Sequence, residues 1–423
     1  MVQVSSLRQL MRGNVLVLTV SSILWSVSDS IVMAYFSLYI LSLGGSPPIV
    51  GIINSVGSLA ASVLYPIGGY IADKAGRAKL VGLSTLLYTS SFVVFAISPS
   101  WEWLAIAFAY QQIVLFYMPA INAIMADSIP IGARGKVYAL TVGVPEAVRI
   151  VTPYFGGYLI AVLTLQPAMR LGYTLAFGIG MVVAFMRLRY LRETISSKEG
   201  VGRNVFKIFR ESYVDVFGSM RWVFANLRGY AVIIILIALM GNFVMPFWIV
   251  FANEVVGLTP YDWGVILLMA GAVRTVMSFV IGSLVDRIGP KRCLIIGIAI
   301  SVPSMALFVT ASSFAQVAAI YLTLVVASAF AWIASSVYLA DVIPRQMRGR
   351  VMAAVGQGVG LGVSGGGYAS GFLVFIPMSI GSLASGFVYS LNPAYPWLIM
   401  SGALALALAV SVLLIKEPEK VQE

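Results

Sequence analysis

Long apolar runs dominate this chain of 423 residues. We count twelve runs of about 20 residues, the length at which a helix crosses the roughly 30 Å hydrocarbon layer of a membrane. Hydrophobic residues make up 60% of the sequence, charged residues only 10%, and the mean hydropathy is +0.95. A soluble protein of this size needs a far more polar surface. The sequence therefore predicts an all-α integral membrane protein with twelve transmembrane helices.

Two short motifs each occur twice in the chain. The sequence GYIADKAGRAKL at residues 69–80 has a weaker copy, GSLVDRIGPKRC, at residues 282–293. Asp127 and Asp341 each stand seven residues before an arginine that is followed by a glycine and a second basic residue. Because the copies keep nearly the same spacing, the two halves of the chain are expected to be repeats of one another.

The first motif resembles the signature of the major facilitator superfamily, G-x-x-x-D-(R/K)-x-G-R-x-(R/K), which lies between the second and third spans. The resemblance implies two pseudo-symmetric six-helix bundles, here residues 1–192 and 230–423, joined by a cytoplasmic amphipathic linker at residues 193–229. In the family, this loop holds the two halves together on the cytoplasmic side. Carried over to this chain, the cytoplasmic gate comprises Gly69, Asp73, Gly76, Arg77, Asp127, Arg134, Asp286, Asp341 and Arg348.

The net charge of +11 suggests a nucleic-acid partner, but the positions of the charges argue against one. If the N-terminus is cytoplasmic, all basic residues except Arg149, Arg170 and Arg274 fall in cytoplasmic loops or termini. Membrane proteins concentrate lysine and arginine on that side. We therefore expect a multi-pass protein of the cell (plasma or inner) membrane with both termini cytoplasmic. The arginines at the end of span six, Arg187 among them, are expected in the cytoplasm.

The sequence offers little chemistry for catalysis. It has no histidine and one cysteine, which excludes histidine-based metal sites, Ser-His-Asp triads and intrachain disulfides. It also has no G-x4-G-K-(S/T) phosphate loop. We expect no enzymatic activity, no cofactor and no metal.

A glycine-rich run at residues 356–371 is predicted to form span eleven. It contains Gly360-x-Gly362-x-x-Gly365, which matches a dinucleotide fingerprint by pattern but lacks the β-α-β context of that motif. Close helix packing within the membrane explains these small residues better. The following residues, 377–396, are predicted to form an external loop.

Four ionisable residues are predicted at mid-membrane depth. Asp29 is near the middle of span one, Glu146 and Arg149 are one turn apart on span five, and Arg274 is in span eight. Charges at this depth are costly unless they face a cavity or a partner, so Asp29 and Glu146 are candidates for proton coupling. Arg149 either alternates between Glu146 and Asp29 or forms a fixed pair with Glu146. The predicted substrate cavity comprises Arg149, Arg274, Gln111, Tyr117, Asn122, Asn242, Trp332 and Met33.

Spans four and five match the drug/proton antiporters of the superfamily in part. In span five, Pro153-x-x-Gly156-Gly157 resembles the end of the antiporter motif. In span four, these antiporters often carry an arginine ahead of a Gln-Gly pair, whereas residues 108–112 read Phe-Ala-Tyr-Gln-Gln. The missing arginine and glycine weaken the antiporter assignment.

The linker is predicted to contain an amphipathic helix. Apolar residues from Val205 to Leu227 recur at helical spacing, opposite a charged face that includes Arg210 and Arg221. A helix lying on the inner membrane surface fits this pattern. A helix packed on the cytoplasmic ends of the protein itself fits it equally well.

These patterns predict a secondary active transporter that moves a small organic solute by alternating access around a central site. Proton coupling is expected, and export of drugs or other amphipathic compounds is slightly favoured. An organic-anion (carboxylate) carrier or an uptake symporter is the alternative, and a membrane sensor or membrane enzyme is a remote one. The expected partners are the small-molecule substrate, protons and the lipid bilayer, and the expected state is a monomer.

Overall fold

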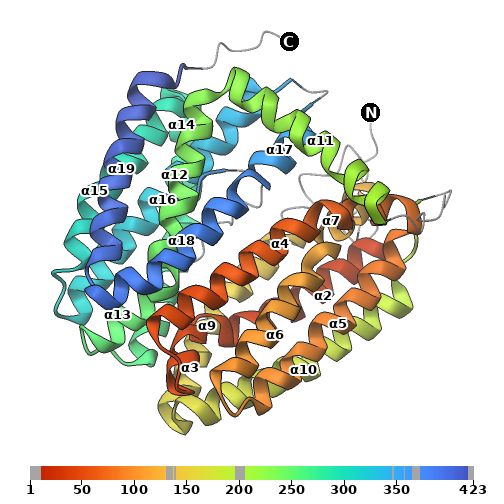
Figure 1. Ribbon diagram of the computed structural model, residues 1–423, viewed down its shortest axis with the longest axis horizontal. Coiled ribbons are helices and arrows are strands. Elements are labelled where there is room, and N and C mark those ends of the chain that lie inside the picture. The colour runs from red at the N-terminus through yellow and green to blue at the C-terminus, as the bar shows by residue number, and fades with distance from the viewer. Residues whose placement is uncertain are drawn as a thin grey trace. The chain divides into compact units, whose positions relative to one another are not determined.

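The computed structural model describes residues 11–129, 137, 140–195, 205–344, 347–356, 358–363 and 372–417 (Figure 1). Every regular element in these residues is a helix. Twelve of these helices, two of them interrupted by a short 3-10 helix, are long and apolar enough to cross a membrane. The prediction of an all-α membrane protein with twelve spans is therefore confirmed.

The chain divides into two compact units. The first comprises Met1–Gly44 and Val63–Tyr213, and the second comprises Gly45–Ser62 and Val214–Glu423. Two helices, α4 (Pro47–Ala75) and α11 (Val205–Asn226), contribute residues to both units. The other helices of the first unit are α2 (Gly13–Met33), α3 (Phe36–Ser42), α5 (Arg77–Ile97), α6 (Trp101–Val114), η1 (Leu115–Tyr117), α7 (Met118–Ser128), α9 (Gly143–Leu163) and α10 (Leu165–Tyr190).

The second unit contains the remaining helices. They are α12 (Arg228–Val244), η3 (Met245–Phe247), α13 (Trp248–Glu254), α14 (Pro260–Ile288), α15 (Pro290–Phe308), α16 (Phe314–Val342), α17 (Arg348–Val355), α18 (Phe372–Leu391) and α19 (Tyr395–Leu414). In Figure 1 they run from green to blue. Their neighbours are far apart in sequence: α19 packs against both α12 and α15.

Helix boundaries repeat between the two halves of the chain. Helices α4 and α14 each have 29 residues, and each begins at a proline, Pro47 and Pro260. Each is followed by a glycine with positive φ, 101° at Gly76 and 89° at Gly289, where a side chain would be strained. Helices α5 and α15 then begin at the next residue. The repeat inferred from the sequence motifs therefore extends to the secondary structure around them.

The core of the first unit forms around α2 and α10. Tyr173 of α10 stacks on Phe95 of α5 with ring centroids 4.8 Å apart, and Trp25 of α2 contacts Tyr88 of α5 at 4.9 Å. Helix α9 lies close against α2 because Gly156 has no side chain. An added Cβ there would lie 2.2 Å from the carbonyl oxygen of Ile31. The second half of α2 is thus enclosed by α5, α9 and α10.

The core of the second unit is built on tryptophan and phenylalanine. Trp248 of α13 contacts Phe308 and Trp397 with ring centroids 4.6 and 5.5 Å apart. Its indole N–H donates a 2.7 Å hydrogen bond to the carbonyl oxygen of Gly362. A buried indole needs such a partner, and the bond ties α13 to the glycine-rich segment.

The predicted external loop at residues 377–396 is wrong. The structure has a membrane-length helix there, α18, with Pro377 inside it. Small residues of α18 allow close packing. An added Cβ on Gly381 would lie 1.9 Å from the carbonyl oxygen of Leu239 on α12, and one on Gly386 would lie 2.3 Å from that of Pro47. The run at residues 356–371, predicted as span eleven, lies partly outside the described residues.

The predicted cytoplasmic position of Arg187 is also wrong. Arg187 lies in the last turn of α10, but its side chain points into the first unit and is 3% exposed. Arg189 and Arg192, by contrast, are exposed. The positive-inside pattern identifies the side of the membrane on which a helix ends, but it does not tell which arginine turns inward.

The linker contains the predicted helix, α11. One of its faces packs on the protein, where Ser212, Ser219 and Val223 are buried. The opposite face leaves Phe217 and Phe224 exposed by 59% and 42%. The packing is the arrangement expected for a helix resting on the protein itself, and contact with the membrane surface stays a prediction.

Candidate functional site

Asp29 lies on α2, half-buried within the first unit. The oppositely charged Arg149 lies on α9, which packs against α2. The two helices approach closely at Gly156, two turns after Arg149. Asp29 and Arg149, both singled out from the sequence, therefore lie on neighbouring helices of the first unit.

Arg149 also pairs with Glu146, one turn earlier on α9. Its Nε lies 3.7 Å from Oε1 of Glu146, and the two side chains are 42% and 44% exposed. That separation exceeds a hydrogen bond, so the pair is held by charge alone. Arg149 therefore pairs with Glu146, one of the two acids that the sequence proposed as its partners.

Three tyrosines of the first unit lie within electrostatic range of Asp29. They are Tyr88 of α5, Tyr117 of η1 and Tyr173 of α10. All three side chains are buried. The sequence identified Tyr117 as a candidate, whereas Tyr88 and Tyr173 were missed. A tyrosine in an apolar span belongs to no motif that would distinguish it from a packing residue.

Arg187 is the second buried cation of the first unit. Its Nε donates to the hydroxyl oxygen of Ser21 at 3.2 Å, and its Nη1 donates to that of Thr85 at 2.9 Å. Its guanidinium also lies beside Tyr117 and 5.8 Å from the ring centre of Trp25. Sequence reasoning missed this group.

The other predicted cavity residues lie in different surroundings. Gln111 of α6 is buried and donates to Ser91 of α5 at 3.1 Å, which uses its amide within the first unit. Asn242 of α12 donates to the carbonyl oxygen of Ala238 and accepts from Ser382. Of the remainder, Met33 and Asn122 are exposed, whereas Trp332 and Arg274 are half-buried. Their role in a cavity stays a prediction.

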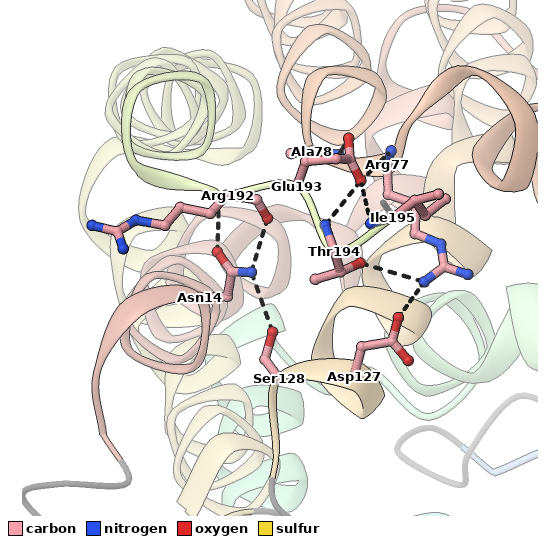
Figure 2. Close-up of polar contacts among 9 residues, drawn as sticks. All are labelled: Asn14, Arg77, Ala78, Asp127, Ser128, Arg192, Glu193, Thr194 and Ile195. Atoms are coloured by element: carbon pink, nitrogen blue, oxygen red, sulfur yellow. Dashed lines mark hydrogen bonds and ion pairs between the residues drawn. The ribbon is translucent and has the colours of Figure 1, made fainter. Parts of the chain in front are cut away.

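A cluster of polar contacts joins the ends of α2, α5, α7 and α10 in the first unit (Figure 2). Arg77, the first residue of α5, forms an ion pair with Asp127 of α7. Its Nη1 also donates to the hydroxyl of Thr194 at 3.4 Å. The predicted gate residues Arg77 and Asp127 therefore contact each other directly.

Glu193 is the residue of this cluster that sequence reasoning missed. Its carboxylate accepts from the backbone N–H groups of Arg77 and Ala78, at 3.1 and 3.2 Å, so it caps the start of α5 (Figure 2). Burial alone would raise the pKa of this carboxyl. The backbone hydrogen bonds from Arg77, Thr194, Ala78 and Ile195 outweigh burial, and the pKa of Glu193 is lowered.

Asn14 closes the cluster at the start of α2. Its side-chain amide donates to the carbonyl oxygen of Arg192 at 2.9 Å and to Ser128 at 3.2 Å, and its Oδ1 accepts from the N–H of Arg192 at 2.7 Å (Figure 2). The segment that follows α10 is thus held by two sets of contacts. Arg192 contacts Asn14, and Glu193 contacts the start of α5.

The remaining gate residues are placed as follows. Gly76 has the positive φ described above, and an added Cβ on Gly69 would contact Pro119 at 3.8 Å. Asp286 and Asp341 are exposed on α14 and α16. Asp73 and Arg348 lie in α4 and α17, but their side chains are outside the described part, as is the whole of Arg134. In the described residues, no group of three or more Cys, Asp or Glu side chains could hold a metal ion.

Comparisons with known proteins agree with this architecture. The family model of the Major Facilitator Superfamily matches residues 18–367 and 231–423. Multidrug resistance protein 2 of Bacillus subtilis (strain 168) is 24% identical over 276 residues, which cover 61% of this chain and 64% of that protein. Multidrug resistance protein MdtG of Rahnella sp. (strain Y9602) is 25% identical over 305 residues, 69% of this chain and 70% of the relative.

Two solved structures show the same fold. The nucleoside transporter NupG matches with a TM-score of 0.67 and 15% identity, over 95% of this chain and 98% of its own. A D-xylose-proton symporter matches with a TM-score of 0.67 and 16% identity, over 97% of this chain and 99% of its own. With the family match across most of the sequence and twelve membrane-length helices, the protein belongs to the major facilitator superfamily and is a multi-pass membrane protein.

Proposed function

We propose that this protein is a proton-coupled secondary transporter that exports amphipathic, drug-like organic compounds by alternating access. The observation that carries the proposal is Asp29, an acid within a membrane span that packs against α9, the span of Arg149. Intramembrane acids of this kind are functional far more often than structural. The names of several relatives, multidrug resistance proteins of bacteria, support the substrate class.

Arg149 is the group that would convert a conformational change into proton transfer. Burial disfavours the ionised form of a carboxyl, whereas a nearby cation favours it. If Arg149 moves towards Glu146, Asp29 loses the charge that stabilises its ionised form and takes up a proton. If Arg149 moves back, Asp29 releases it. The 3.7 Å separation between Arg149 and Glu146 suits a pair that is exchanged in this way.

Met33 is a side chain that suits an amphipathic substrate. It lies on the same helix as Asp29 and is 38% exposed. Methionine adapts to substrates of different shape because its side chain is flexible and polarisable. Such a side chain binds by apolar contact and tolerates variation in the substrate.

A carboxylate carrier is the second candidate. Nε of Arg149 is buried and has no hydrogen-bond partner among the described residues, so it offers a donor to an anionic substrate. Arg149 would then hold a carboxylate.

We also propose that both termini are cytoplasmic and that the protein acts as a monomer. The orientation is supported by the concentration of basic residues in the predicted cytoplasmic loops. Insertion of single cysteines near each terminus, followed by labelling of intact cells with an impermeant thiol reagent, tests the orientation.

Transport by Asp29→Asn in everted vesicles tests the main proposal. The probe is ethidium, a lipophilic cation, driven by a pH gradient. Asp29→Asn is expected to abolish gradient-driven accumulation but to spare counterflow exchange, which needs no net proton movement. Glu102→Gln is the matched control, because Glu102 is an exposed acid at the start of α6. Gradient-driven accumulation by Asp29→Asn at the wild-type rate would remove Asp29 from the coupling role.

Benzoate uptake separates the two candidates. If the protein is a carboxylate carrier, it transports benzoate and not ethidium, and Arg149→Gln abolishes that transport. If it exports amphipathic compounds, benzoate neither enters nor competes.

A further inference from the structure

Arg187 is a buried cation whose hydrogen-bond partners are uncharged hydroxyl groups. Its side chain is 3% exposed, and it contacts the hydroxyls of Ser21 and Thr85, the phenol of Tyr117 and the ring of Trp25. Neither of the ion pairs found in the described part of the chain, Arg77 with Asp127 and Arg149 with Glu146, includes it.

Such an arrangement is costly for the fold. Moving an ion out of water costs several kcal/mol, and hydroxyl groups recover only part of that cost. An apolar residue of similar size would fill the same space without the penalty. The cost suggests that the charge has a use beyond packing.

The geometry of α2 relates Arg187 to Asp29. Ser21, Trp25 and Asp29 are spaced by four residues, so they follow one another along one side of the helix. Asp29 lies two helical turns beyond Ser21, about 12 Å along the axis. Trp25, whose ring faces the guanidinium of Arg187, lies between them. Arg187 is therefore on the same side of α2 as the acid.

Tyr117 links the two charges. Its hydroxyl lies beside the guanidinium of Arg187 and the hydroxyl of Thr85, and it is within electrostatic range of Asp29. A cation beside a phenol oxygen makes the O–H of that phenol a stronger donor. Arg187 can thus act on Asp29 through Tyr117 as well as through its own field.

We propose that Arg187 is a positioning residue of the coupling site, a fixed positive charge that orients Tyr117 and helps to hold Asp29 in its ionised form. This inference rests on the proposed coupling role of Asp29.

Several other groups face Asp29. The neighbouring helices present Tyr88 on α5, Arg149 on α9 and Tyr173 on α10. Glu146 pairs with Arg149, and Asp127 of α7 pairs with Arg77. An experiment on Arg187 must therefore change Arg187 alone and read the protonation of Asp29 directly.

Infrared titration of the Asp29 carboxyl in purified protein provides that reading. The protonated carboxyl band of Asp29 is identified as the band absent from Asp29→Asn. In Arg187→Gln, the pH at which the band is half-developed is expected to move upward. Arg187 bonds Ser21, which lies about 12 Å along the axis from Asp29, and one charge at about that distance, at an effective dielectric of about 20, gives a shift of about one unit. Arg187→Lys keeps the charge and is expected to restore most of the wild-type midpoint.

Two further results decide the role of Tyr117. Tyr117→Phe removes the phenol but not the charge, and it is expected to move the midpoint in the same direction by a smaller amount. A midpoint in Arg187→Gln equal to that of wild type, in protein that unfolds at the wild-type temperature, would overturn the proposal. If Arg187→Gln does not fold, Tyr117→Phe carries the test, and a wild-type midpoint in Tyr117→Phe would overturn the proposal.

The infrared titration of Asp29 does not depend on transport activity. The coupling proposal fails if Asp29→Asn transports as wild type does, whereas this inference fails if the band does not shift. The two failures are therefore distinguishable.

Discussion

The carboxylate of Glu193 accepts a hydrogen bond from the backbone N–H of Arg77, so a residue beyond the end of α10 caps the first turn of α5 (Figure 2). The residue that would ordinarily cap this helix is Gly76, which has no side chain. Glu193 thus accepts hydrogen bonds from the first N–H groups of α5, for which Gly76 has no side-chain acceptor. It also fixes the start of the linker to the motif at residues 69–80.

Replacing this cap should destabilise the protein. Glu193→Ala removes the acceptor for the N–H groups of Arg77 and Ala78, and loss of a helix cap costs about 0.5–2 kcal/mol. Thermal unfolding in detergent at pH 7 measures the change. Glu102→Ala, at the exposed start of α6, is the control for loss of an acid. An unfolding temperature of Glu193→Ala equal to that of the control would show that the cap contributes nothing.

The contribution of Glu193 should also depend on pH. Its pKa is lowered in the folded protein, mainly because its backbone hydrogen bonds outweigh burial. The stabilisation is therefore fully present above the ordinary glutamate pKa, about 4.3, and is lost as the pH falls through the lower folded-state value. The difference in unfolding temperature between wild type and Glu193→Gln should shrink when the pH is lowered from 7 to 3. A constant difference would contradict this assignment.

Asn14 should be more important for stability than its partner Ser128. Asn14→Ala breaks three hydrogen bonds, two to the backbone of Arg192 and one to Ser128, and leaves part-buried backbone groups unpaired. An unpaired buried group costs about 1–3 kcal/mol. Ser128→Ala breaks only one of these bonds and is the matched comparison. Equal unfolding temperatures for the two variants would argue against a role for Asn14 in holding the linker.

The pair of Arg77 and Asp127 should influence transport more than stability. The side chain of Asp127 is 49% exposed, and exposed ion pairs contribute about 0–1 kcal/mol. Asp127→Asn should therefore unfold within a few degrees of wild type but alter the rate of exchange, as expected for a gate. Unchanged exchange in Asp127→Asn would leave the pair without a gating role.

Gly381 should not tolerate a side chain. Gly381→Ala would place a Cβ against the carbonyl oxygen of Leu239, a backbone atom that cannot move aside alone. Gly402→Ala on α19 meets nothing within 4 Å and is the matched control, expected to be neutral or slightly stabilising. Yields of folded protein by size-exclusion chromatography compare them. Equal yields would mean that α12 and α18 pack less closely than the structure shows.

Features encoded by local pattern could be predicted from the sequence. The twelve spans follow from the length of apolar runs, and the duplication follows from motifs that recur near the starts of α5 and α15. Asp29, Glu146 and Arg149 were found because a charge in an apolar run is conspicuous.

Features that depend on contacts between distant residues could not be predicted. Glu193 caps a helix that begins more than a hundred residues earlier, and nothing in the linker sequence indicates that partner. Arg187 was assigned to the cytoplasm because its neighbours are arginines and the direction of its side chain depends on α2 and α5. Residues 377–396 were predicted to form a loop, and the reason for a glycine at position 381, the backbone of Leu239 on α12, is not visible in the local sequence.

The most direct test of the account measures proton and substrate movement together. Purified protein in liposomes that contain a trapped pH-sensitive dye receives ethidium on one side, and both fluorescence signals are followed. We predict that wild type moves protons opposite to ethidium, and that Asp29→Asn exchanges ethidium without moving protons. Proton movement coupled to ethidium at the wild-type ratio in Asp29→Asn would contradict the central claim that Asp29 carries the proton.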